Sequence, residues 1–183
     1  ADKQFFRTHF LPCFKKLEIK PFMDDPYYNM IKFPKGENGN WSFETRACKA
    51  YEAFVYDDPV IFPDGKILPR IGFFDTEYPY PAVIENNREW MTLMPNETNT
   101  TKPAVAAAHG NVLTYGLGLG YFAFMAAIKP EVKSVTVVER SKNVIELFTK
   151  YILPQFPDPT KIKIVESDAF VFAEKQMQKG IYD

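Results

Sequence analysis

The chain has 183 residues, of which 46% are hydrophobic and 25% charged, and its formal net charge is −1. This composition is typical of a globular protein with a hydrophobic core, and the near-zero charge argues against general binding to nucleic acid or to an anionic membrane. The sequence has neither the apolar run of a secretory signal nor a stretch long enough to cross a bilayer. We therefore expect a cytoplasmic protein that acts on a small molecule, either as a monomer or as a homo-oligomer.

Cysteine and histidine are both scarce. The two cysteines, Cys13 and Cys48, are too few for the disulfide framework of a small secreted domain, so we expect free thiols. We interpret the two histidines, His9 and His109, as structural rather than catalytic residues. No metal site is expected.

Aromatic and proline residues are concentrated in the first hundred positions, which favours a compact unit with many turns. Near the N-terminus, the spacing of the aromatic side chains from Phe5 to Phe10 predicts a short helix that Pro12 interrupts. Residues 41–54 also carry apolar side chains at helical spacing, with Ser42 suited to cap the first turn. We expect this second helix to pack on a sheet.

Residues 54–93 have the pattern of short strands. Two apolar stretches, 54–56 and 60–62, flank Asp57-Asp58-Pro59 and predict a strand on each side of a turn. Further along, Asn86-Asn87 separates two apolar runs and predicts a hairpin. We expect a small antiparallel unit that packs over the ligand site of the following domain, and we assign residues 1–100 to this β-rich N-terminal unit with short helices.

A connection follows the β-rich unit. Residues 94–98 are predicted to form a loop, and residues 103–109 a short helix with Pro103 near its start and Gly110 just past its end. His109 would then lie at the C-terminus of this helix.

From residue 111 the pattern alternates between strand and helix. Alternating elements of this kind predict a parallel sheet with helices on its faces, in a Rossmann-like, doubly wound α/β fold that we assign to residues 101–183. The predicted strands are 112–115, 134–139 and 162–165, with a fourth opening at 181–183. The predicted helices are 121–128, one through Val144 and Tyr151 that stops before Pro154, and 169–179.

Candidate binding residues follow each of these strands. Gly116, Gly118 and Gly120 form a glycine turn between the first strand and its helix, Glu139 ends the second strand, and Asp168 follows the third. The carboxyl ends of parallel strands meet at one edge of the sheet, where ligands of α/β proteins bind. A carboxylate can accept hydrogen bonds from both ribose hydroxyls, and Asp168 can accept one from an adenine amino group or cap the next helix.

The spacing of the glycines helps to choose the ligand. The dinucleotide fingerprint is G-x-G-x-x-G, whereas here the third glycine comes one position earlier. This spacing argues against NAD and favours another adenosine-containing ligand.

The stretches 112–120, 137–139 and 166–170 resemble the first three motifs of class I S-adenosylmethionine-dependent methyltransferases. Residues 134–145 with Asp168-Ala169-Phe170 are most similar to the spermidine synthase branch, which also has a small β-rich N-terminal unit. The resemblance implies that the glycines flank the methionine part of the cofactor, Glu139 the ribose, and Asp168 with Ala169 the adenine. The candidate cofactor-binding residues are Tyr115, Gly116, Gly118, Gly120, Glu139, Arg140, Asp168 and Ala169.

The chain departs from the spermidine synthase pattern in its glycine turn. That branch carries an acidic residue there to hold the amine substrate, whereas this chain has Leu117 and Leu119. The leading hypothesis is therefore a methyltransferase of unknown substrate. The alternatives are an aminopropyltransferase that uses decarboxylated S-adenosylmethionine and a non-catalytic nucleotide-binding or assembly module.

The resemblance also implies that the fourth strand pairs with the first. The chain reaches only Tyr182-Asp183, so we expect the remaining strands and the catalytic groups to come from a continuation or from a separate chain. Without them the first strand would be an open apolar edge.

Overall fold

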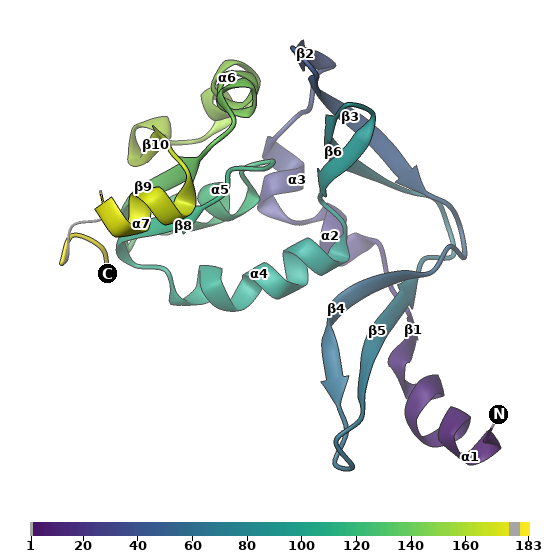
Figure 1. The fold of residues 1–183 in the computed structure, drawn as a ribbon. Coiled ribbons are helices and arrows are strands. Elements are labelled where there is room, and N and C mark those ends of the chain that lie inside the picture. The colour runs from purple at the N-terminus through teal and green to yellow at the C-terminus, as the bar shows by residue number, and fades with distance from the viewer. Residues whose placement is uncertain (1, 176–179) are drawn as a thin grey trace.

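The computed structural model describes residues 2–175 and 180–183. These residues form a mixed α/β structure with three sheets, one of which is a parallel sheet of three strands (Figure 1). The strand orders are β1-β5-β4, β2-β3-β6-β7 and β10-β9-β8. Within the described ranges, no helix has the length and apolar character needed to cross a membrane.

The N-terminal segment is helical, as predicted, and Pro12 lies in a 3₁₀ turn that ends it. Both Phe6 and Phe10 are exposed, so this segment does not bury one aromatic face. The elements here are α1 (Lys3–Phe5), a π-helical turn (Phe6–Phe10), a 3₁₀ turn (Leu11–Cys13), β1 (Phe14–Lys16), α2 (Lys20–Met23) and α3 (Pro26–Met30).

The helix predicted over residues 41–54 is wrong. Residues Trp41–Cys48 form strand β3, which pairs with β2 (Gly36–Asn38) and β6 (Tyr78–Glu85). Trp41 and Phe43 alternate with less buried neighbours, which is the period of a strand. Ser42 therefore caps no helix.

The predicted hairpin is confirmed. Strand β6 turns into β7 (Arg88–Thr92) through Asn86 and Asn87, whose φ angles of 50° and 63° suit the tight turn between hairpin strands. The other antiparallel pair is β4 (Phe54–Ile61) with β5 (Ile67–Phe73). The two short strands predicted around residues 57–59 are one strand, because register shifts accommodate this segment within β4.

The connection between the two halves is helix α4 (Pro95–Ala107), so the loop predicted over residues 94–98 is wrong. Pro95 occupies the first turn, where its missing N–H costs nothing, and Pro103 is tolerated inside the helix. Packing against β4 stabilises this helix, and Asn99 Nδ2 donates a 2.9 Å hydrogen bond to the Tyr56 carbonyl. His109 lies beyond the helix and is exposed, which corrects its predicted place in the last turn.

The parallel sheet follows the predicted alternation closely. Val135 and Val137 of its central strand belong to the core that contains α5 and α6, whereas Thr136 lies on the face where Phe172 of α7 packs. The strands are β8 (Gly110–Tyr115), β9 (Val132–Glu139) and β10 (Ile162–Glu166), and the helices are α5 (Tyr121–Ala127), α6 (Lys142–Tyr151) and α7 (Ala169–Lys175). Short 3₁₀ turns at Leu153–Gln155 and Pro159–Lys161 join α6 to β10. The predicted end of the last helix, residues 176–179, lies outside the described residues.

In the described part of the chain, β8 is an edge strand of the parallel sheet. Residues 181–183 do not form the predicted strand, but Asp183 lies beside β8. The Asp183 N–H donates to the Asn111 carbonyl at 3.0 Å, and the Asp183 carboxylate accepts from the Asn111 N–H at 2.8 Å. The chain therefore runs next to β8 at this point.

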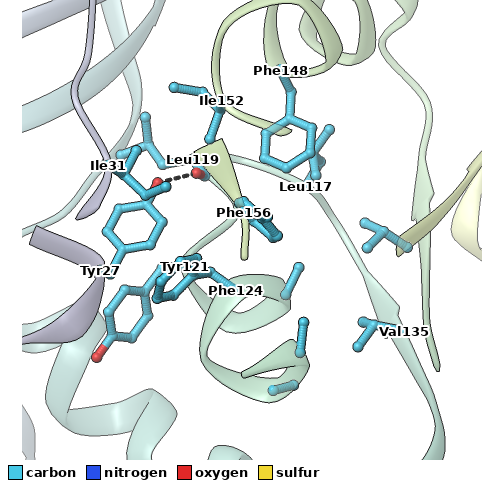
Figure 2. Packing of buried hydrophobic residues seen from close by; sticks show 14 of the residues in the cluster. Tyr27, Ile31, Leu117, Leu119, Tyr121, Phe124, Val135, Phe148, Ile152 and Phe156 are labelled. Atoms are coloured by element: carbon cyan, nitrogen blue, oxygen red, sulfur yellow. Dashed lines mark hydrogen bonds between the residues drawn. The ribbon is translucent and has the colours of Figure 1, made fainter. Parts of the chain in front are cut away.

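One hydrophobic core joins the N-terminal strands to the parallel sheet. Tyr27 of α3 packs edge-on against Phe124 of α5, and its hydroxyl donates a hydrogen bond to the Leu119 carbonyl (Figure 2). Phe156 packs between Phe124 and Phe148 (Figure 2). The predicted division at residue 100 falls inside α4, so a helix rather than a linker spans it.

Candidate functional site

The glycine turn connects β8 to α5 at the carboxyl end of the parallel sheet. Gly116, Gly118 and Gly120 all have positive φ angles, of 84°, 50° and 78°. The Gly116 N–H donates to the Val138 carbonyl at 2.8 Å, which ties the start of the turn to β9. Positive φ angles cost glycine the least of all residues, so the backbone conformation favours glycine at all three positions.

The surroundings of the three glycines differ. A side chain at Gly116 would meet no atom within 4 Å, because this position opens into a cavity. A side chain at Gly118 would collide with the Met91 sulfur, and one at Gly120 with the Phe148 ring. Gly116 therefore leaves room for a ligand, whereas Gly118 and Gly120 leave room for the protein's own side chains.

The carboxylate of Glu139 is held in place by the backbone on both sides of it. Its Oε2 accepts a 2.9 Å hydrogen bond from the Leu117 N–H in the glycine turn, and its Oε1 accepts a 2.8 Å bond from the Ser141 N–H before α6. Each carboxylate oxygen can accept a further hydrogen bond. Glu139 is thus fixed in orientation and retains acceptor capacity toward the cavity that it lines.

Asp168 caps helix α7, which confirms one of its two predicted roles; the other is to accept a hydrogen bond from an adenine amino group. Its Oδ1 accepts hydrogen bonds from the N–H groups of Phe170 at 2.9 Å and Val171 at 3.2 Å. The side chain is also exposed beside a second cavity, next to Ala169 and the 80% exposed Phe170. Capping leaves the other carboxylate oxygen available to a ligand.

Two cavities adjoin along the carboxyl ends of the three parallel strands. The first has a volume of about 320 Å³ and the second a volume of about 260 Å³. They share the lining residues Trp90, Gly116 and Glu139 and are therefore direct neighbours, and the two together are called the groove. The first is lined by Trp90, Met91, Glu97, Thr101, Thr114, Tyr115, Gly116, Leu117, Gly118, Tyr121, Phe122, Ala123 and Glu139. The second is lined by Trp90, Gly116, Val138, Glu139, Arg140, Ser167, Asp168, Ala169 and Phe170.

The β6–β7 hairpin forms one wall of this groove. Trp90 of β7 is half exposed where the two cavities meet, and the Arg140 guanidinium lies 5.7 Å from the centre of its ring. Trp41 also packs against Trp90 in an edge-to-face arrangement, at a ring separation of 5.7 Å. The indole is therefore in contact with a cation and with a second indole, and part of its surface is open to the groove.

Helix α4 adds a carboxylate to the first cavity. Glu97 is partly buried there, and burial raises the pKa of its carboxyl group above the usual range. No hydrogen bond or ion pair to this carboxylate is found among residues 2–175 and 180–183. Thr101, one helical turn later, lines the same cavity.

Most of the residues selected from the sequence lie together. Tyr115, Gly116, Gly118 and Glu139 line the first cavity, and Arg140, Asp168 and Ala169 line the second. Gly120 lines neither cavity. Among the lining residues that sequence reasoning missed, Trp90, Met91, Glu97 and Thr101 come from the β6–β7 hairpin and from α4.

The groove suits an extended ligand with a polar, hydrogen-donating middle and a cationic end. The first cavity contains two carboxylates, Glu97 and Glu139, and no basic residue of the described chain lines it. The second has the exposed aromatic ring of Phe170 and a carboxylate, a combination suited to a flat base with an amino group. A scan against protein-family models and a comparison with curated proteins found no match to this chain.

Proposed function

We propose that this protein binds S-adenosylmethionine and is a transferase of the class I methyltransferase type, with a Rossmann-like fold over residues 101–183. The observation that carries the proposal is the position of Glu139, whose carboxylate is fixed by the N–H groups of Leu117 and Ser141 at the junction of the two cavities. A carboxylate oriented in this way matches the paired hydroxyls of a ribose.

The ends of the ligand follow from this central contact. The adenine would lie in the second cavity beside Asp168, Ala169 and Phe170, and the methionine part would lie in the first cavity beside Gly116. The absence of a side chain at Gly116 lets this part approach the backbone closely. The two carboxylates of the first cavity would favour the positively charged sulfonium and ammonium groups of this part, whose own carboxylate would point away from them.

Methyl transfer needs few catalytic groups from the protein. S-adenosylmethionine supplies a methyl group that is already activated for transfer to a nucleophile. The protein's contribution is to bind the cofactor, to orient it and to limit the access of water. Leu119 is buried in the core, and Leu117, which lines the first cavity, carries no charge that could hold an amine, so the glycine turn lacks the acidic residue of the aminopropyl branch, which supports methyl transfer over aminopropyl transfer.

Isothermal titration calorimetry on the 183-residue chain tests the proposal directly. S-adenosylmethionine is expected to bind with a Kd in the micromolar range, and NAD⁺ is expected not to bind. Decarboxylated S-adenosylmethionine is the comparison ligand for the aminopropyl alternative. If neither form of the cofactor binds, a non-catalytic role of the fold is the remaining explanation.

Trp90 offers a separate test of the groove. Its half-exposed ring lies where the two cavities meet. Replacing Trp90 with alanine is therefore expected to raise the Kd for S-adenosylhomocysteine by about 5- to 30-fold, which corresponds to the loss of roughly 1–2 kcal/mol of aromatic contact. Trp90→Phe is the matched control, since it keeps an aromatic face, and it should bind within about threefold of wild type. Equal affinity of wild type and Trp90→Ala would exclude the hairpin from the binding site.

A further inference from the structure

The groove contains one carboxylate, that of Glu97, to which the proposed adenosine contacts assign no role. Glu97 lies in the first turn of α4 and lines the first cavity together with Thr101. The hydroxyls of two other residues on this helix, Thr98 and Thr100, donate instead to the carbonyls of Pro95 and Asn96. Glu97 and Thr101 therefore define the side of the helix that faces the cavity.

The environment of Glu97 differs from that of Glu139. Two backbone N–H groups already stabilise the charge of Glu139, whereas no hydrogen bond or ion pair to the Glu97 carboxylate comes from any described residue. The titratable side chains that line the cavity with Glu97 are those of Tyr115, Tyr121 and Glu139, and none of them is a cation. An ionised carboxylate that is partly buried without a partner is unfavourable, and an added cation would offset this cost.

We propose that Glu97 binds the protonated amine at the end of the ligand's aliphatic tail, and that the Thr101 hydroxyl is a second acceptor for the same group. This inference rests on the proposed function, because the tail reaches the first cavity only if the ribose lies at Glu139. It makes α4, and not the glycine turn, the element that selects ligands with an amine. The recognised chemistry is a primary ammonium group joined to an adenosine thioether or sulfonium.

Calorimetry with two stable probes tests the inference. S-adenosylhomocysteine carries the amine, and 5′-methylthioadenosine has the same adenosine thioether without it. Glu97→Gln is expected to raise the Kd for S-adenosylhomocysteine about 10- to 100-fold, the loss of one hydrogen-bonded charge contact, and to change the Kd for 5′-methylthioadenosine by less than about twofold. Retained binding of 5′-methylthioadenosine also shows that the variant is folded.

Glu89→Gln is the matched control. Glu89 is an exposed carboxylate beside Trp90 that pairs with Arg46 and lines neither cavity, so its loss should change neither Kd. Thermal unfolding of the ligand-free protein distinguishes ligand binding from a structural role, because a structural role of Glu97 would make Glu97→Gln lower the Tm. Burial raises the pKa of Glu97, which means that ionising this carboxyl group costs more free energy in the folded protein than in the unfolded chain, so Glu97→Gln should not lower the Tm of the ligand-free protein.

The outcomes separate the two proposals. If both probes bind wild type and Glu97→Gln weakens neither, or weakens both equally, the role of Glu97 is overturned while the proposed function stands. If neither probe binds wild type, the proposed function fails and the role of Glu97 fails with it.

Discussion

Replacing Glu139 with alanine is expected to weaken binding of S-adenosylmethionine about 100-fold, because two hydrogen bonds to a charged acceptor are lost and each contributes roughly 1.5 kcal/mol or more. The same change also removes the acceptor that holds the Leu117 and Ser141 N–H groups, so the glycine turn keeps only its backbone hydrogen bond from the Gly116 N–H to the Val138 carbonyl of β9. The effect should appear as a higher Kd in calorimetry.

Glu166→Ala is the control for this experiment. Glu166 lies directly opposite Glu139 in the register of β10 against β9, but it lines neither cavity. Its replacement removes the same charge from the same edge of the sheet and should leave the Kd within about twofold of wild type. An unchanged affinity of Glu139→Ala would rule out the ribose contact.

The second large effect is expected at Gly120. Gly120→Ala should lower the free energy of unfolding by about 3 kcal/mol, since it places a side chain at a φ of 78° and drives it into the Phe148 ring in the core (Figure 2). Urea unfolding followed by circular dichroism measures this loss as a lower midpoint at constant slope.

Gly116→Ala is the matched comparison. Its φ of 84° causes similar backbone strain, but no atom lies within 4 Å of the added side chain, so about 1 kcal/mol of destabilisation is expected. Because Gly116 lines both cavities, this variant should lose ligand affinity more than stability. Equal losses of stability in the two variants would contradict the separate roles given to these glycines.

The parallel sheet could be predicted from the sequence because each of its elements has a strong local signal. Apolar runs end at Tyr115, Glu139 and Glu166, and a helical pattern or a capping residue follows each of them. Because the carboxyl ends of parallel strands lie at one edge of a sheet, the predicted strands placed Gly116, Glu139 and Asp168 together at that edge. These residues line the groove in the structure.

The N-terminal half was harder to predict because its local signals conflict with its packing. Alanines within residues 41–54 favour a helix, but burial of Trp41 and Phe43 against neighbouring strands selects a strand. In α4, Pro103 argues against a continuous helix, and packing against β4 overrides it.

Part of the site could not be predicted for the same reason, since packing between distant segments determines it. Nothing near Glu97 in the sequence marks it as a cavity residue, and Trp90 is one of many aromatic residues in this half. Both become candidate ligand contacts only when the hairpin and α4 lie against the glycine turn. Contacts between distant segments, such as Met91 with Gly118, determine that arrangement.

The most direct measurement is a structure of the protein in complex with S-adenosylhomocysteine. We expect both ribose hydroxyls within hydrogen-bonding distance, about 2.6–3.2 Å, of the Glu139 carboxylate, with the adenine beside Asp168 and Phe170. A ligand bound outside the groove, or bound in it with its ribose away from Glu139, would contradict the central claim.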